Sequence, residues 1–336
     1  MERPPTEKRI EEGMLVADRY EIRSMIGKGG MGQVFKALDR QSSTEVALKT
    51  LHPKYTGNKQ ALSRFVREVK LARQLHHPGI VKIFDARQWN DTLFYTMEYL
   101  EGKSLRQWLR QDKRLSLRAT VRVLCLVCEA LDHAHRITIH RDLSPENVMV
   151  LPDGSIRVLD FGLAKLDDRF KGLTRVGFNL GKIDYMSPEQ EQDASVVDHR
   201  ADLYSLGVMF YEMLSGRTPR MVAEAVAQGQ GTPKNVAAGC AVPQLAKLTE
   251  TRPDLPPEAD HFAEKALARN PDGRFASAAE FRKELLNLYT VYRERVGVAA
   301  VLAAEEQAKA EALAELGMLG RTKVLLLRIF RRDRRR

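Results

Sequence analysis

The first hundred residues carry short runs in which apolar and polar positions alternate, a pattern typical of half-buried β-strands. The predicted strands are Tyr20–Ile26, Val34–Leu38, Glu45–Lys49, His77–Ile83 and Leu93–Leu100. One stretch has a helical period instead, with apolar residues at 62, 65, 66, 69, 72 and 75. The pattern therefore predicts a mainly β unit with a single helix, ending near residue 100.

Beyond that point, longer segments with helical spacing replace the strands. They are Ser104–Arg110, Leu117–His135, Asp198–Leu214, two segments within 259–289, and an Ala/Glu-rich segment at 291–316. Asp198–Leu214 is apolar nearly all round, as expected of a buried central helix. Leu151–Leu159 predicts a short hairpin, because its Asp-Gly pair is a strong turn signal.

The composition fits a soluble protein with a sizeable core, since 43% of the 336 residues are hydrophobic and 29% are charged. The net charge of +10 is concentrated in the last sixteen residues, from Arg321, which hold eight Lys/Arg and one acid. That basic tail accounts for +7 and leaves +3 for the rest. Three interpretations stay open for the tail: contact with an anionic membrane surface, docking of a protein partner, or disorder. Nucleic-acid binding is disfavoured because no stacking aromatics are interleaved.

The three cysteines are too few and too badly spaced for a disulfide framework, which fits a reducing cytosol. Cys125 and Cys128 lie in an apolar helical segment and are expected to pack in the core, since a zinc site would need a second pair. Residues 1–13 predict a disordered leader without a signal-peptide apolar region. No apolar run reaches the roughly 18 residues of a membrane span. We expect a cytoplasmic protein, with any membrane contact peripheral.

A glycine-rich motif, G-x-G-x-x-G-x-V, occupies Gly27–Val34. Its glycines let the backbone approach a phosphate without a Cβ in the way. Dinucleotide-binding loops share this pattern but open into a helix, whereas the chain here continues as a strand. Lys49 ends the next strand, and Glu68 flanks the apolar stripe of the helix, so the two are candidates for an ion pair beside the phosphates. The alternative is a solvated lysine and a surface glutamate.

A second group of polar residues follows the helix at Leu117–His135. Ile139–Asn147 contains Asp142 and Asn147, and Asp160-Phe161-Gly162 begins thirteen residues after Asn147. Two carboxylates and an amide on neighbouring loops suit the binding of magnesium and the deprotonation of a hydroxyl.

The order and spacing of these motifs resemble the eukaryotic-type (Hanks-type) serine/threonine protein kinases. Gly29–Val34, Tyr185–Gln190 and Ala268–Phe275 look like the bacterial members of that family. The resemblance covers residues 14–289 and implies an α+β, bilobal fold. Its parts would be a small β-rich N-lobe at 14–98, a hinge at 99–102 and a larger helical C-lobe at 103–289, followed by an Ala/Glu-rich helix and the basic tail at 290–336.

The same resemblance implies ATP and Mg²⁺ as cofactors and proteins bearing Ser/Thr as substrates. Asp142 would orient the substrate hydroxyl and accept its proton. Lys49, oriented by Glu68, would anchor the α- and β-phosphates, while Asn147 and Asp160 would bind Mg²⁺. The implied nucleotide pocket, with Met97 as gatekeeper, consists of Ile26, Gly27, Gly29, Gly32, Val34, Ala47, Lys49, Met97, Glu98, Leu100 and Met149.

Two structural features are implied as well. An ion pair between Glu189 and Arg274 would fix the substrate platform without taking part in the chemistry. A stacked apolar column rooted on Asp202 would join the lobes, with the members Phe161, His140, Ile83 and Ala72.

Two positions depart from the pattern of the family. Ser144 stands where most serine/threonine kinases carry a lysine that touches the γ-phosphate, and Gly181-Lys182 stands where they carry glycine-threonine. We hypothesise that a hydroxyl and an ammonium have exchanged places, with Lys182 reaching toward Asp142 and the γ-phosphate. The alternative is that Lys182 is a solvated loop lysine and activity is lower.

Arg141, ahead of the catalytic aspartate, indicates regulation by an anion, and phosphothreonine is the natural one. Thr174 is the only hydroxyl residue between Phe161 and Lys182, so it is the predicted autophosphorylation site. The alternative is an unmodified loop.

Three rival functions are weighed against the serine/threonine kinase. A pseudokinase scaffold that binds nucleotide and protein partners is favoured only by Ser144. A small-molecule kinase is disfavoured by the Ser187-Pro188-Glu189 segment and Arg274, which resemble parts of a protein-substrate platform. A tyrosine kinase is disfavoured by Ser144–Asn147 after Leu143.

Overall fold

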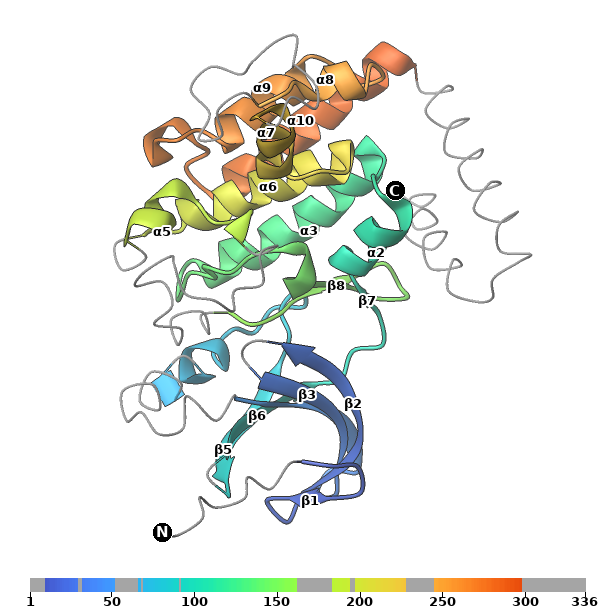
Figure 1. Cartoon of the computed structure of the whole chain (residues 1–336), viewed down its shortest axis with the longest axis vertical. Helices are drawn as coiled ribbons and strands as arrows, with labels where there is room; N and C mark the ends of the chain where they lie inside the picture. The colour runs from blue at the N-terminus through green and yellow to red at the C-terminus, as the bar shows by residue number, and fades with distance from the viewer. Residues whose placement is uncertain are drawn as a thin grey trace, which may run out of the picture.

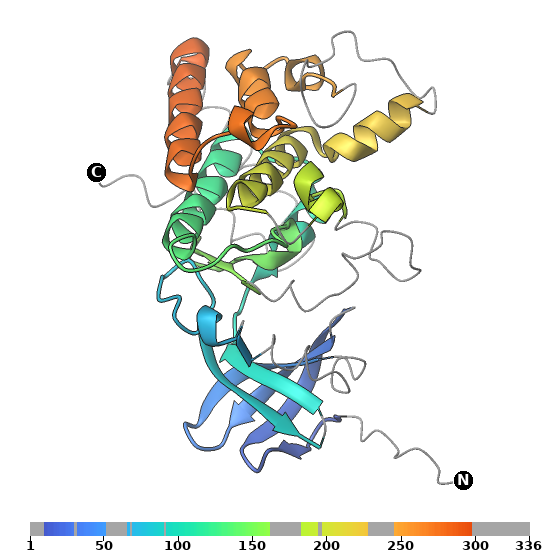
Figure 2. The ribbon, with the colours of Figure 1, turned by 90° about the vertical axis from the view of Figure 1, so that its left-hand side faces the viewer.

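The computed structural model describes residues 10–29, 32–51, 66–67, 69–90, 92–161, 183–193, 197–227 and 245–297. In these ranges an antiparallel sheet forms one lobe and a mainly helical part forms the other, arranged along the long axis of the molecule (Figure 1). A quarter turn shows the same two bodies joined by short connecting segments (Figure 2). The predicted α+β architecture, a small β-rich N-lobe followed by a larger helical C-lobe, is confirmed.

The N-lobe sheet has the order β1-β2-β3-β4-β6-β5, with every neighbouring pair antiparallel. Its strands are β1 (Leu15–Val16), β2 (Tyr20–Gly29), β3 (Gly32–Asp39), β4 (Thr44–Thr50), β5 (Ile83–Trp89) and β6 (Thr92–Glu98). Alternating side chains bury both faces of the sheet. In β6, Phe94 packs in one core cluster with Tyr20. Tyr95 faces the other way and packs with Val69 and Ala72, from a helical segment that includes residues 69–72.

The strand predicted at His77–Ile83 is wrong, because β5 begins only at Ile83. The preceding residues form a turn in which the Ile80 N–H donates to the carbonyl of His77 (3.0 Å). Ile80 and Val81 are buried without a strand: Ile80 packs in the C-lobe core and Val81 in the N-lobe core. Their backbone pairs with Val158 of the C-lobe, where the Val81 N–H donates to the Val158 carbonyl (3.0 Å). A segment that connects the two lobes therefore has the same apolar pattern as a strand of the sheet.

The C-lobe consists of a small sheet of order β7-β8-β9 and a set of helices. The strands and 3₁₀ turns are β7 (Lys103–Ser104), β8 (Val148–Val150), β9 (Ile156–Val158), η2 (Pro145–Asn147) and η5 (Pro271–Gly273). The helices are α2 (Leu105–Asp112), α3 (Leu117–Ala134), α5 (Pro188–Asp193), α6 (Arg200–Ser215), α7 (Pro219–Ala227), α8 (Leu248–Thr251), α9 (Glu258–Ala266) and α10 (Ala278–Val296). Ser104 and Ser116 cap α2 and α3, which explains why these helices begin there.

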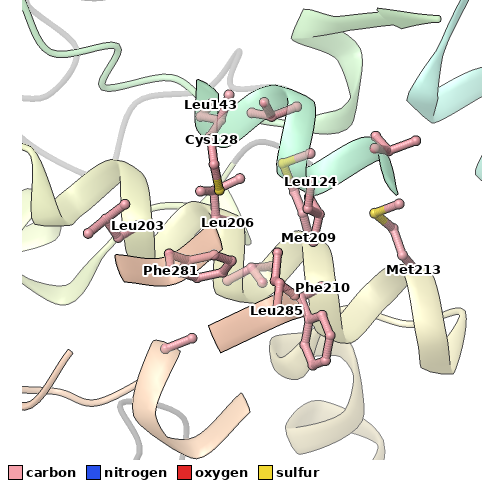
Figure 3. Packing of buried hydrophobic residues seen from close by; sticks show 14 of the residues in the cluster. Leu124, Cys128, Leu143, Leu203, Leu206, Met209, Phe210, Met213, Phe281 and Leu285 are labelled. Atoms are coloured by element: carbon pink, nitrogen blue, oxygen red, sulfur yellow. The ribbon is translucent and has the colours of Figure 1, made fainter. Parts of the chain in front are cut away.

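The core of the C-lobe is built around α6, which is buried over almost its whole length as the apolar pattern predicted. Leu206 and Met209 of α6 share one cluster with Leu124 and Cys128 of α3 and with Phe281 of α10 (Figure 3). The helix α6 is therefore held by apolar packing against α3 and α10.

Both cysteines of α3 belong to this cluster, which confirms their expected role in core packing. Burial raises the pKa of Cys125 to about 11 and the pKa of Cys128 well above its ordinary value. The thiols are therefore neutral near pH 7, and packing is the role that their surroundings support.

Two predicted boundaries at the ends of the domain are corrected. α10 continues without interruption to Val296 and is capped by Gly297 (φ 78°), so no separate helix begins at 291. Residues 10–13, assigned to the leader, are in contact with the sheet: the Gly13 N–H donates to the Ile22 carbonyl (2.9 Å), and Ile10 packs on the core. Residues 1–9 and 298–336 lie outside the described ranges, and within those ranges no helix is both long and apolar enough to cross a membrane.

Candidate active site

The backbone of the loop that carries Asp142 is held in place by a buried carboxylate. Asp202, in the first turn of α6, accepts hydrogen bonds from the backbone N–H groups of His140 (2.9 Å) and Arg141 (2.7 Å). His135, at the end of α3, contacts the same carboxylate (2.9 Å). Burial acts to raise the pKa of Asp202, but the hydrogen bond and charge of His135 outweigh it, and the pKa lies below its usual range. An ionised Asp202 therefore holds the start of the loop in one shape.

Asp142 and Asn147 face each other across this loop. The Asn147 side-chain amide donates from Nδ2 to the Asp142 carbonyl (2.6 Å) and to its Oδ2 (3.2 Å). Because the carbonyl acceptor requires a donor, the amide orientation is determined, and the Asn147 Oδ1 is the atom left to face a cation. The predicted base and the predicted metal ligand are thus brought together.

Asp160 lies at the junction of the lobes and is contacted by two residues of the N-lobe sheet. Lys49 Nζ is 2.5 Å from Asp160 Oδ2, and the Tyr95 hydroxyl donates to Asp160 Oδ1 (2.7 Å). Lys49 was predicted to pair with Glu68, which lies outside the described residues, so that pair stays a prediction. In this structure the carboxylate beside Lys49 is Asp160.

Tyr95 was missed from the sequence, where it appears only as one more aromatic residue in an apolar strand. Its side chain is 1% exposed. Burial, and then the charge of Asp160, raise the pKa of Tyr95 well above its ordinary value, so its hydroxyl stays protonated. Its distance from Asp160 along the chain hides the contact from any local pattern.

Two pairs of residues from the predicted column are described, and the stacking of one pair on the other across the lobes stays a prediction. The rings of His140 and Phe161 are in contact, with centroids 4.7 Å apart, and the imidazole Nε2 of His140 is 2.8 Å from the Leu159 carbonyl oxygen. Ile83 and Ala72 share a cluster of buried residues in the N-lobe. The first pair fixes the position of the segment that carries Asp160.

The predicted nucleotide residues come from five strands, β2, β3, β4, β6 and β8, and from the hinge. Val34, Ala47, Met97 and Leu100 belong to one apolar cluster or pack against it, which supplies a surface for a flat base. Gly27 and Gly29 lie at the end of β2, and Glu98 ends β6. Ile26 is half exposed and Met149 lies in β8, and neither belongs to this cluster.

Gly32 is a position that only glycine fits. Its φ is 149°, and a Cβ on it would lie 1.7 Å from the carbonyl oxygen of Thr50. This close approach lets β3 turn back over the end of β4, and it is the reason for the third glycine of the motif. The strand that continues from Gly32 excludes the dinucleotide-binding alternative, which would require a helix.

Ser144 is buried at 1% exposure, and its hydroxyl has no hydrogen-bond partner within the described part of the chain. Lys182, the residue that was predicted to exchange with Ser144, lies outside the described residues, and so does Thr174. The two predictions that concern them stay predictions. Arg141 is described and adopts a left-handed backbone conformation (φ 66°) beside the catalytic loop.

The predicted ion pair between Glu189 and Arg274 is confirmed. Arg274 Nη1 and Nη2 lie 2.6 Å and 2.8 Å from the two carboxylate oxygens of Glu189. The Arg274 side chain is 0% exposed. Three backbone carbonyls, of Ala268, Arg269 and Arg200, accept its remaining hydrogen bonds.

A second, partly buried arginine was not predicted. Arg106 of α2 donates to Glu146, in the loop that carries Asp142 and Asn147 (2.7 Å), and to Glu212 of α6 (2.6 Å). The Tyr185 hydroxyl contacts both Arg106 and Glu212. Local sequence gives no signal for this network, because its members come from four separate segments.

The donor set at Asp160 and Asn147 suits Mg²⁺. The cation prefers oxygen ligands and is commonly held by one or two protein groups together with phosphate oxygens. In the described ranges no group of three or more His, Cys, Asp or Glu residues is arranged to hold a metal on its own. The Asp160 carboxylate and the side-chain Oδ1 of Asn147 therefore fit a metal that arrives with a nucleotide.

Comparison with known proteins agrees with this geometry. A family model described as "Protein kinase domain" matches residues 20–286. The chain is 38% identical over 300 residues to serine/threonine-protein kinase pkn3 of Myxococcus xanthus, covering 85% of this chain and 52% of that protein. It is 35% identical over 280 residues to serine/threonine-protein kinase PknB of Mycolicibacterium smegmatis, covering 82% and 43%.

Among solved structures, the PknI kinase domain of Mycobacterium tuberculosis is similar, with a TM-score of 0.64 and 27% sequence identity. That match covers 84% of this chain and 99% of the PknI chain. The chain spans about half the length of the two curated relatives, 52% and 43%.

Proposed function

The chain belongs to the protein kinase domain family, and from that membership we propose that it transfers the γ-phosphoryl group of ATP to serine and threonine hydroxyls of proteins. One observation carries the proposal: the Asp202-anchored loop holds Asp142 and Asn147 within hydrogen-bond reach of each other. Phosphoryl transfer depends mainly on alignment and charge stabilisation, and a loop fixed at its base supplies the alignment.

Each polar residue of the site has a distinct role in this proposal. Asp142 orients the attacking hydroxyl and takes its proton. Lys49 binds the α- and β-phosphates, and Asn147 and Asp160 hold Mg²⁺. The metal ion, when bound, neutralises part of the phosphate charge.

Labelled ATP tests the proposal directly. The full chain is incubated with [γ-³²P]ATP, Mg²⁺ and a generic protein substrate, and the labelled residues are identified after acid hydrolysis. We expect phosphoserine and phosphothreonine. Label on tyrosine alone would contradict the proposed specificity.

The second candidate is a scaffold that binds nucleotide without transferring a phosphoryl group. It is favoured by the buried Ser144, which stands where the family usually carries a lysine that touches the γ-phosphate. The same incubation separates the two functions. Saturable ATP binding without any transfer, to the chain itself or to added protein, would favour the scaffold.

For the variant residues we propose the exchange in which Lys182 replaces the charge that Ser144 lacks. Lys182→Thr and Ser144→Lys should each lower kcat about 10-fold, the effect of one charge-assisted contact of about 1.5 kcal/mol. The double variant should recover activity to within about 3-fold of wild type, because one ammonium is restored. Steady-state kinetics measure all three, and Lys283→Thr, an exposed change in α10, is the control. Simply additive losses would contradict the exchange.

For regulation we propose that Thr174 is autophosphorylated and that its phosphate contacts Arg141. A phosphothreonine adds about two negative charges, which an arginine binds through short, charge-assisted hydrogen bonds. Mass spectrometry of the active protein should find Thr174 modified, and Thr174→Ala should remove that phosphopeptide and lower activity. Fully active protein with an unmodified Thr174 would contradict the proposal.

The basic tail from Arg321 keeps three interpretations, namely a membrane surface, a protein partner or disorder. Co-sedimentation with vesicles of anionic phospholipid, with and without residues 321–336, tests the first. Tail-dependent binding that weakens as salt is raised would support a peripheral membrane contact.

A further inference from the structure

Tyr95 combines deep burial with a polar contact to the site. It lies in β6 directly opposite Lys49 of β4 in the register of the sheet. Residues opposite each other on neighbouring strands place their side chains on the same face, so both reach toward Asp160. The Lys49 ammonium lies 5.9 Å from the centre of the Tyr95 ring.

Tyr95 and Lys49 contact different oxygens of the Asp160 carboxylate. The Tyr95 hydroxyl donates to Oδ1 (2.7 Å), and Lys49 Nζ lies 2.5 Å from Oδ2. A carboxylate held at both oxygens cannot rotate about its Cβ–Cγ bond without losing one of the two contacts. The orientation of the predicted metal ligand is therefore set by two residues of the other lobe.

The two donors differ in charge, and the difference decides which of them is compatible with a bound cation. An ammonium close to a carboxylate competes with Mg²⁺ and is repelled by it. A hydroxyl is neutral and opposes a cation only weakly. Lys49 also has a second use, at the phosphates, whereas the Tyr95 hydroxyl points at Asp160 from a buried strand.

We propose that Tyr95 is a positioning residue for the metal site, whose hydroxyl keeps Asp160 oriented for Mg²⁺ when Lys49 moves to the phosphates. The proposal rests on the proposed function, since it takes Asp160 as a magnesium ligand. It assigns to Tyr95 the role of an outer partner that orients a ligand, and loss of such a partner commonly costs 10- to 100-fold in metal affinity.

A role in packing alone is the competing explanation, because Tyr95 also belongs to the N-lobe core cluster. Tyr95→Phe separates the two, since it keeps the ring and removes only the hydroxyl. Tyr20→Phe is a matched control: Tyr20 is equally buried in the same sheet, and its hydroxyl is 3.5 Å from Asp85 rather than at the site.

The test uses the full chain and Mn²⁺, a paramagnetic stand-in for Mg²⁺. Free Mn²⁺ is measured by electron paramagnetic resonance during titration in the presence of saturating AMP-PNP, which cannot transfer its phosphoryl group. We expect Tyr95→Phe to raise the Mn²⁺ Kd roughly 10-fold. AMP-PNP affinity without metal should stay within about 2-fold, and Tyr20→Phe should match wild type, because neither measurement depends on the Tyr95 hydroxyl.

A double-mutant cycle distinguishes action through Asp160 from a general effect on the lobe. In an Asp160→Asn background, Tyr95→Phe should change the Mn²⁺ Kd by less than about 2-fold, because the residue through which it acts has lost its charge. Equal Mn²⁺ affinity of wild type and Tyr95→Phe, or additive effects in the cycle, would overturn the proposal while leaving the kinase function intact. Wild type that binds no Mn²⁺ with nucleotide would overturn both.

Thermal melting of the metal-free proteins checks that the variants are folded. Tyr95→Phe should melt within a few degrees of wild type, because it removes one neutral hydrogen bond and keeps the buried ring. If the variant melts far below that, Tyr95 acts chiefly in the core, and the positioning role is rejected.

Discussion

Replacing Asp142 by asparagine should lower kcat for phosphoryl transfer by about 100- to 10,000-fold, the range expected when a general base is removed. Asparagine has nearly the same shape and still accepts a hydrogen bond from Asn147 through its amide oxygen, so the loop keeps its geometry. It cannot take a proton from the substrate. The loss should therefore appear in kcat, with the KM for ATP little changed.

Steady-state kinetics with labelled ATP, together with calorimetric measurement of ATP binding, check this result. Asp132→Asn is the control, because Asp132 is a half-exposed carboxylate of α3 that pairs with Arg136 on the surface (3.4 Å). The control should behave as wild type. An Asp142→Asn protein that retains more than about a tenth of the wild-type kcat would exclude Asp142 as the essential base.

Replacing Glu189 by glutamine should lower the free energy of unfolding by about 3 kcal/mol, because it leaves the fully buried Arg274 without its counter-charge. The estimate is at the low end for a broken buried pair, since three carbonyls continue to accept hydrogen bonds from Arg274. For a domain of this size the melting temperature should fall by roughly 6–12 °C. Urea unfolding and calorimetry measure the two quantities.

A neighbouring ion pair provides the control for burial. Arg200 and Asp272 are also 2.6 Å apart, but the Asp272 side chain is 78% exposed. Asp272→Asn should therefore cost less than about 1 kcal/mol. Equal losses from Glu189→Gln and Asp272→Asn would show that burial does not determine the strength of these pairs.

The Glu189 pair also predicts a dependence on pH. Burial acts to raise the pKa of Glu189, but the hydrogen bond and charge of Arg274 outweigh it, so the folded-state pKa lies below the usual range. Stability from this group is then complete above the ordinary glutamate pKa of about 4.3 and is lost as the pH falls below it. The difference between wild type and Glu189→Gln should accordingly shrink in that acidic range.

The sequence predicted elements well where hydrophobic periodicity and local signals agreed. Most predicted strands and the buried helix α6 appear at the expected places, because each is defined by its own side chains. The prediction of a strand at His77–Ile83 failed because Ile80 is buried in the core cluster of the C-lobe and Val81 in that of the N-lobe, while neither belongs to a strand of the N-lobe sheet. Periodicity reports burial and does not say against what a residue is buried.

The residues of the candidate site also fall into two groups, those that the sequence reveals and those that it does not. Asp142, Asn147 and Asp160 belong to motifs with fixed spacing, and a motif can be recognised without the fold. Tyr95 and Arg106 belong to no motif, since their partners lie 40 to 106 positions away along the chain. Such contacts exist only once strand register and helix packing have brought distant segments together. Glu68, Lys182 and Thr174 stay predictions.

The carboxylate of Asp202 has a consequence for how this domain responds to heat. Asp202 lies in the first turn of α6 and accepts the hydrogen bonds that shape the loop carrying Asp142, so we expect the loop and the helix to unfold as one cooperative unit. Substitutions that weaken the packing of α6 should then give temperature-sensitive proteins, active when cool and inactive when warm, without any change to a residue that touches substrate. Temperature-sensitive substitutions of this chain should accordingly concentrate at the buried positions of α6.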